Sequence, residues 1–244
     1  MSGEDCGARA WKEMHSRTLF TEDCDIGMAR IPDGSIDLIL TDPPYLQETY
    51  QQAYGTLARH AARILKPSGF LVTYSAHFYL PWVMGLLSQS LEWYWLMVQE
   101  NRAPRARIWN RNLTAAYKPI LIFQKAPLKK QEWFGVDILP RSYMEKRYHK
   151  WQQSLKEALY LAELYGHPGD TVLDPFAGSG TSLLAAELLG MPWMGFEINP
   201  KVAETARGRL SQTTLADLPP KTLMRPARAV DGRKTKGTTL KGWA

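Results

Sequence analysis

Residues 174–181 (Asp-Pro-Phe-Ala-Gly-Ser-Gly-Thr) combine a carboxylate with a glycine-rich turn. The apolar residues 171–173 before them predict a buried strand, and residues 182–189 after them predict a helix. Glycines let a ligand lie directly against the backbone, and a helix start presents unpaired N–H groups. Asp174 could then hold an amino group of that ligand. The spacing excludes both a dinucleotide fingerprint and a P-loop, and leaves a tight turn without ligand as the alternative.

A second stretch, residues 42–45 (Asp-Pro-Pro-Tyr), follows residues 36–41, which predict a strand buried on both faces. The two prolines fix the backbone and remove two N–H donors, so the Pro43 carbonyl is free to face a ligand. Together with the Asp42 carboxylate it offers two acceptors beside the ring of Tyr45. This combination suits the exocyclic amino group of a planar base. The alternative is a rigid turn with a packed tyrosine.

Expected strands and helices alternate along most of the chain, which predicts an α/β fold with a mostly parallel sheet and helices on both faces. The expected strands are 17–21, 36–41, 70–74, 93–98, 120–123, 171–173 and 192–198, with 93–98 and 120–123 as a closing pair. The expected helices are 54–65, stopped by residues 66–69, and 81–91, 153–165, 182–189 and 200–209. Because parallel strands share one carboxyl edge, four acids should line one crevice: Asp23, Asp42, Asp174 and Glu197.

The composition suits one domain with a large core, since 45% of the 244 residues are hydrophobic. No apolar run is long enough for a transmembrane helix, and the N-terminus has no apolar segment typical of a signal peptide. The two cysteines, Cys6 and Cys24, fit a reducing cytoplasm and form no metal site. The five histidines show no ligand spacing, so no metal is predicted.

Positive charge is concentrated in two blocks. Residues 102–150 carry 12 basic and 3 acidic side chains, and residues 219–244 carry 7 and 1. Such a field suits a phosphate backbone, although a solvated basic face would look the same. We expect one folded domain at 1–218 that contains the basic block 102–150 as an insert. Residues 219–244 have little apolar content and are expected to form a flexible basic tail.

Residues 42–45 and 174–181 resemble the two signatures of amino-methylating DNA methyltransferases. The catalytic motif precedes the cofactor motif, as in the β group of that family, and the likeness runs from about Thr18 to Arg209. It implies a Rossmann-like methyltransferase fold with a seven-stranded, mostly parallel sheet and a circularly permuted chain. It also implies S-adenosylmethionine as cofactor, double-stranded DNA as partner and a base flipped out of the duplex. Family habit implies a bacterial or phage enzyme in the cytoplasm, associated with the nucleoid, and leaves a homodimer open.

The resemblance assigns roles residue by residue. The target base would be bound by Asp42, Pro43, Pro44 and Tyr45. The glycine turn would hold the methionine end of the cofactor, Glu197 its ribose and Asp23 its adenine. The full cofactor set is Asp23, Asp174, Pro175, Phe176, Gly178, Ser179, Gly180, Thr181, Glu197, Ile198, His149 and Gln152. Ser154 departs from the family, which usually has proline there, and residues 117–119 resemble the segment before the last strand.

The basic insert supplies the expected DNA contacts. In the family, target recognition would fall in the short segment 126–148. The candidate phosphate or base contacts are Arg102, Arg105, Arg107, Arg111, Lys129, Lys130, Arg141, Lys146 and Arg147, and Trp109 and Asn112 could fill the gap or touch bases.

Several activities remain open at this point. The aspartate at position 42 favours adenine N6 methylation within the family, and cytosine N4 methylation is the alternative. Methylation of RNA or of a protein glutamine, and a silent DNA-binding module, are further alternatives. No cysteine stands in a Pro-Cys motif, which speaks against cytosine C5 methylation.

Overall fold

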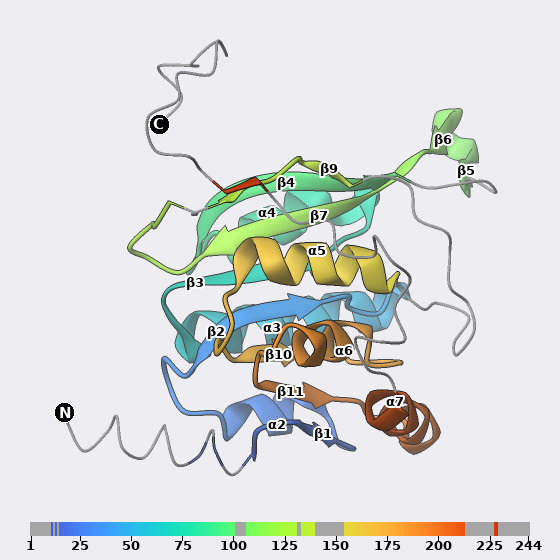
Figure 1. Cartoon of the computed structure of the whole chain (residues 1–244). Helices are drawn as coiled ribbons and strands as arrows, with labels where there is room; N and C mark the ends of the chain where they lie inside the picture. The colour runs from blue at the N-terminus through green and yellow to red at the C-terminus, as the bar shows by residue number, and fades with distance from the viewer. Residues whose placement is uncertain are drawn as a thin grey trace.

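The computed structural model describes residues 11, 13, 15–100, 106–130, 133–139, 154–212 and 227–228, and it is built around one large sheet (Figure 1). The sheet has eight strands in the order β1-β11-β10-β2-β3-β7-β4-β9. Their bounds are β1 Thr18–Phe20, β2 Ile36–Thr41, β3 Leu65–Tyr74, β4 Glu92–Glu100, β7 Tyr117–Gln124, β9 Ile138–Leu139, β10 Val172–Asp174 and β11 Trp193–Phe196.

The pairing confirms a mostly parallel sheet. The strands β1, β11, β10, β2 and β3 run parallel to one another, and β7 runs antiparallel to both β3 and β4. All seven expected strands are present, and the two-residue β9 adds an eighth at the edge. Strand β10 comes late in the sequence, yet it lies between β11 and β2 in the middle of the sheet. This placement is what the permuted motif order predicts.

Helices cover both faces of the sheet (Figure 1). Helices α2 Cys24–Ala29, α3 Gln47–Ile64 and α4 Leu80–Leu87 pack on one face, and α5 Leu155–Tyr165, α6 Thr181–Leu188 and α7 Pro200–Gln212 on the other. The central strand β2 serves both layers, because Leu38 and Leu40 join the α5 side while Ile39 joins the α3 side. Its nearly continuous apolar sequence therefore reflects burial on both faces.

Three local expectations need correction. Helix α2 was not predicted, because six residues are too few to show a helical period. Helix α3 begins at Gln47 rather than at residue 54. Residues 66–69 belong to strand β3 rather than to a turn: the Ser68 N–H donates to the Lys125 carbonyl at 2.9 Å, and the Lys125 N–H donates to the Gly69 carbonyl at 2.9 Å. Long-range pairing overrides the local turn signal there.

The basic insert forms a projecting hairpin. Strands β5 Ala106–Ile108 and β6 Leu113–Ala115 pair antiparallel around the short 3₁₀ turn η2 Trp109–Arg111, away from the main sheet (Figure 1). Residues 219–244 were expected to form a flexible tail. Within them, Ala227–Arg228 form the short strand β12, which pairs antiparallel with β8, Trp133–Phe134. The rest of 219–244 lies outside the described residues.

Candidate active site

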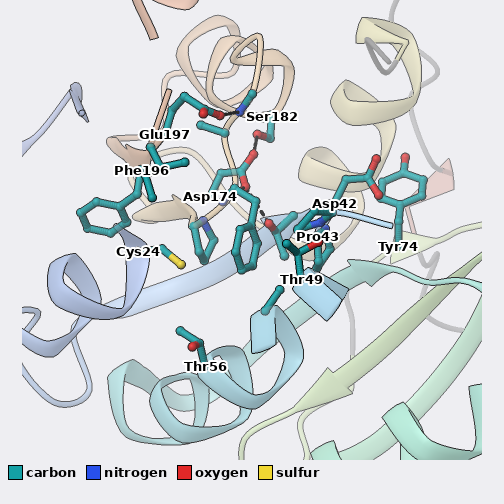
Figure 2. Close-up of a pocket in the computed structure, with 18 of the residues that line it drawn as sticks. Cys24, Asp42, Pro43, Thr49, Thr56, Tyr74, Asp174, Ser182, Phe196 and Glu197 are labelled. Carbon is teal, nitrogen blue, oxygen red and sulfur yellow. Dashed lines mark hydrogen bonds between the residues drawn. The ribbon is translucent and has the colours of Figure 1, made fainter. Parts of the chain in front are cut away.

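The two motifs meet at the carboxyl edge of the sheet. Strand β2 ends at Thr41, directly before Asp42, and its parallel neighbour β10 ends at Asp174, at the start of the glycine turn. Both loops line one cavity of about 790 Å³ (Figure 2). The predicted convergence of acidic strand ends is confirmed, because Asp23 and Glu197 line the same cavity.

The glycine turn has the backbone that its sequence predicts. Gly178 and Gly180 have φ angles of +50° and +74°, in the region that favours glycine. The Gly178 N–H donates to Oε2 of Glu197 at 3.0 Å, and the Asn199 N–H donates to Oε1 at 2.8 Å. Two backbone amides thus fix the Glu197 carboxylate beside the turn. Helix α6 then begins at Thr181.

Asp174 is a buried carboxylate with three internal donors. It is 4% exposed, and its Oδ1 accepts from the Thr41 hydroxyl at 2.7 Å and from the Phe176 N–H at 3.0 Å. Its Oδ2 accepts from the Ser182 hydroxyl. Burial raises the pKa of Asp174 to about 6, the hydrogen bonds oppose the shift, and the nearby Asp42 carboxylate adds to it.

Asp42 is held from two sides. The Tyr45 hydroxyl donates to its Oδ1 at 2.7 Å, and the Lys118 ammonium donates to its Oδ2 at 2.7 Å. The same ammonium lies 4.7 Å from the ring centroid of Tyr45 and 4.6 Å from that of Tyr74. A carboxylate, a cation and two aromatic faces therefore surround one region of the cavity.

An aromatic cluster beneath Tyr45 supports this region. The ring centroid of Tyr50 lies 6.1 Å from that of Tyr45 and 4.7 Å from that of Tyr54. The Tyr50 hydroxyl is 2.8 Å from the Ser75 hydroxyl, and the Tyr54 hydroxyl donates to the Tyr74 carbonyl. Helix α3 is thereby tied to the end of β3, which keeps the cavity wall in place.

The remaining residues predicted to bind the cofactor or the target base are placed as follows. Asp23 lies three residues beyond β1, where its carboxylate caps helix α2 by accepting from the Asp25 N–H at 2.7 Å. Gly180 belongs to the glycine turn without lining the cavity, whereas Pro43, Pro44, Tyr45, Pro175, Phe176, Ser179, Thr181 and Ile198 line it. His149 and Gln152 lie outside the described residues.

The predicted DNA contacts are only partly described. Arg107 and Arg111 lie on the projecting hairpin, and Lys129 and Lys130 are exposed after β7. Arg102, Arg105, Arg141, Lys146 and Arg147 lie outside the described residues, as do 131–132 and 140–148 of the expected recognition segment.

Sequence reasoning missed several cavity residues. Thr41 and Ser182 stand one residue before and one residue after the two motifs, and their hydroxyls reach Asp174. Their position directly next to the motifs was the signal from which they could have been predicted. Lys118 lies in residues 117–119, which resemble the family segment before the last strand, but no local pattern predicted its contact with Asp42, 76 residues away in sequence. Helix α3 adds a polar row that was also unexpected: Thr49, Gln52 and Thr56.

Other classes of site find no support in the described part of the chain. No group of three or more histidine, cysteine, aspartate or glutamate side chains there could hold a metal ion. Among the helices described, none has the length and apolarity needed to cross a membrane.

The fold and the cavity define a class. A mostly parallel sheet with helices on both faces, and a glycine turn and an Asp-Pro-Pro-Tyr loop on one cavity, are the features of an S-adenosylmethionine-dependent methyltransferase with permuted motif order. Residues 36–208 match a family described as DNA methylase, the N6 and N4 methyltransferases, and the chain belongs to that family. The resemblance inferred from the two motifs is thus confirmed.

Curated relatives agree with this assignment. The type II methyltransferase M.BamHI of Bacillus amyloliquefaciens is 25% identical over 228 residues, which cover 74% of this chain. The chain spans 54% of the length of M.BamHI. The putative methylase YubD of Escherichia coli (strain K12) is 26% identical over 210 residues, covering 78% of this chain and 88% of YubD.

Solved structures share the fold. The complex of M1.HpyAVI with S-adenosylmethionine has a TM-score of 0.67 at 23% identity, covering 79% of this chain and 98% of M1.HpyAVI. The cytosine-N4-specific PvuII DNA methyltransferase has a TM-score of 0.69 at 19% identity, covering 79% of this chain and 85% of that enzyme. The expected fold is therefore confirmed, and S-adenosylmethionine is the cofactor that this family and fold imply.

The cavity fits that cofactor. Its volume of about 790 Å³ lies in the range of small-molecule sites, about 300–1,000 Å³. Carboxylates at Asp174, Glu197 and Asp23 suit the amino and hydroxyl groups of an aminoacyl nucleoside. Phe176 and Phe196 add apolar surface.

Proposed function

We propose that this protein transfers a methyl group from S-adenosylmethionine to the N6 amino group of an adenine flipped out of double-stranded DNA. The observation that carries the proposal is the single cavity shared by Asp42 and the 174–181 turn. A bound base and a bound methyl donor could meet there without a covalent enzyme intermediate. Positioning and placed dipoles would then supply most of the catalysis.

The cofactor would be held by residues at three strand ends, those of β10, β11 and β1. Asp174 and the glycine turn would bind its methionine part, Glu197 its ribose hydroxyls and Asp23 would lie near its adenine. When bound, it supplies an electrophilic methyl group on a sulfonium. The two backbone amides on Glu197 keep that carboxylate oriented for hydroxyl donors.

The target base would be held by residues 42–45. The Asp42 carboxylate and the Pro43 carbonyl would accept the two amino hydrogens, and the ring of Tyr45 would support the base by stacking. Acceptance of both hydrogens localises the lone pair of the amino nitrogen, which makes it a better nucleophile. The hydrogen bonds from Tyr45 and Lys118 keep the Asp42 carboxylate in one orientation.

The projecting hairpin is our candidate for the DNA-contacting arm. The guanidinium of Arg107 lies 5.4 Å from the ring centroid of Trp109, and that of Arg111 lies 5.4 Å from the ring centroid of Phe78. Trp109 is 75% exposed at the tip. An exposed aromatic ring flanked by arginines suits a phosphate backbone and the gap left by a flipped base.

Cytosine N4 is the alternative acceptor, because cytosine also presents an exocyclic amino group to the same acceptors. Aspartate at position 42 favours adenine over cytosine, because the family that the two motifs resemble favours adenine N6 methylation when aspartate stands there. Membership of the DNA methylase family favours DNA over RNA or a protein glutamine as substrate.

One experiment tests the proposal. The protein is incubated with unmethylated DNA and labelled S-adenosylmethionine, the DNA is digested to nucleosides, and the labelled nucleoside is identified. We expect the label in N6-methyldeoxyadenosine. Labelled N4-methyldeoxycytidine would overturn the choice of adenine, and absence of label from every nucleoside would overturn DNA methylation. The Asp42→Ala variant controls for contaminating methyltransferases.

A further inference from the structure

Lys118 lies at the target-base end of the cavity. It is the second residue of β7, and its side chain is 20% exposed. Its ammonium donates to Oδ2 of Asp42 at 2.7 Å and lies near the faces of Tyr45 and Tyr74. The lysine therefore stands beside the carboxylate and the ring that the proposed function assigns to the base.

The Lys118 ammonium carries more N–H donors than its hydrogen bond to Asp42 uses. A lysine ammonium carries three N–H groups. Among the residues that the structure describes, Lys118 Nζ makes its one side-chain hydrogen bond to Asp42. A carboxylate can accept about four hydrogen bonds, so Asp42 can accept a further donor while it keeps Lys118. The pair can thus bind a ligand without coming apart.

Asp42 and Lys118 form an acceptor–donor pair. Their facing atoms, Oδ2 and Nζ, are 2.7 Å apart. The Watson–Crick edge of adenine presents an amino group next to the ring nitrogen N1, and cytosine presents an amino group next to N3. Each edge is therefore a donor beside an acceptor, the complement of the protein pair. Flipped bases are commonly recognised through this edge.

We propose that Lys118 donates a hydrogen bond to the ring nitrogen adjacent to the target amino group. This inference rests on the proposed function and adds a specificity-determining residue to it. Thymine and guanine carry an N–H group at the corresponding ring position, which would face the ammonium as a second donor. The pair Asp42 and Lys118 thus selects an amino base and fixes its rotation on Tyr45.

The proposal also gives a reason for a half-buried ion pair. Such pairs add little net stability, because desolvation offsets their attraction. A pair that serves recognition is retained for its geometry. The competing roles are a lysine that only orients Asp42, and a lysine that fills the base position until DNA arrives.

A substrate analogue separates these roles. Duplexes contain the target site, found by sequencing of methylated DNA, with adenine or 1-deazaadenine at the target position; 3-deazacytosine serves if cytosine is the target. Each analogue replaces the ring nitrogen by a C–H group. We measure kcat/KM for the wild type and for Lys118→Met, together with Kd for the same duplexes in the presence of S-adenosylhomocysteine.

Lys66→Met is the matched control. Lys66 also pairs with an aspartate, Asp37, but at the opposite, amino end of β2 and β3. The wild type and this control are expected to lose about 10- to 100-fold on the analogue, the value of a hydrogen bond to a charged group. On the natural duplex, the kcat/KM of Lys118→Met should be lower than that of the wild type by a similar factor. On the analogue, the kcat/KM of this variant should be at most about twofold lower than its own value on the natural duplex.

Three results would overturn the inference. In the first, the wild type uses the analogue as well as the natural base. In the second, the analogue penalty persists unchanged in Lys118→Met, as it would if the lysine only oriented Asp42. In the third, Lys118→Met binds the natural duplex more tightly than the wild type, as a displaced placeholder would. If Lys118→Met is inactive, the Kd values decide. Failure of the proposed function is a separate result, seen as wild-type protein that labels no nucleoside.

Discussion

The Thr41 hydroxyl donates a 2.7 Å hydrogen bond to Oδ1 of Asp174, although the two residues are 133 positions apart in sequence. Thr41 directly precedes Asp42, and Asp174 opens the glycine turn. Both residues are buried. This bond therefore joins the loop assigned to the base with the loop assigned to the cofactor, and it fixes their spacing.

Replacement of Thr41 by valine tests that relationship. Thr41→Val leaves the buried Asp174 carboxylate with one donor fewer, and we expect it to lower the free energy of unfolding by about 1–3 kcal/mol. Urea denaturation measures the change. Thr41→Ser, which keeps the hydroxyl, is the control and should lose less. Equal stability of Thr41→Val and the wild type would show that the bond contributes nothing.

The pKa of Asp174 makes stability depend on pH. In an unfolded chain an aspartate has a pKa of about 3.9, and burial raises that of Asp174 to about 6. Between these values the folded protein binds more protons than the unfolded chain, so the contribution of this group falls as pH rises. A shift of this size corresponds to about 3 kcal/mol. Unfolding from pH 4 to 7 should show a shallower decline in Asp174→Asn than in the wild type, and identical profiles would contradict the assignment.

Cofactor binding should have the opposite pH dependence. The proposed function needs the ionised form of Asp174 to hold the cofactor amino group. The affinity for S-adenosylmethionine is therefore expected to weaken as pH falls through about 6, approaching tenfold per pH unit. Calorimetric titrations from pH 5 to 8 measure it. Asp174→Asn should bind weakly at every pH; an unaltered wild-type affinity at pH 5 would remove Asp174 from this role.

Asp42→Ala separates chemistry from cofactor binding. The variant removes one acceptor for the amino hydrogens, and kcat is expected to fall by at least about 100-fold. The Kd for S-adenosylmethionine should stay within about twofold, because the glycine turn and Glu197 remain. Single-turnover methylation and calorimetry measure the two effects. Retained turnover would place the base acceptor elsewhere.

The hairpin prediction concerns charge. Each arginine that neutralises a phosphate contributes about 0.9 to the slope of log K against log salt concentration. Arg107→Ala with Arg111→Ala should therefore reduce the slope of DNA binding by nearly 2 if both contact phosphate. Arg59→Ala, which removes an exposed arginine of α3 paired with Asp25, is the control. An unchanged slope in the double variant would exclude the hairpin from the DNA interface.

The described parts of the fold follow the sequence where local rules are strong. The apolar stretch Ile36–Thr41 predicted a strand buried on both faces, and the structure has it with the same bounds. The positive φ angles of Gly178 and Gly180 also follow from residue type. Short elements such as α2 and the β5–β6 hairpin were not predicted from the sequence, because three to six residues carry too little periodicity.

The amino-acid sequence by itself determined the two motif loops, their order and the strands that end in them, because periodicity and backbone preference act over neighbouring residues. Tertiary structure alone decided which side chains meet those loops. Lys118 reaches Asp42 because β7 pairs antiparallel with β3, and Thr41 reaches Asp174 because β10 inserts next to β2. Such contacts depend on strand order and register, which no local pattern encodes.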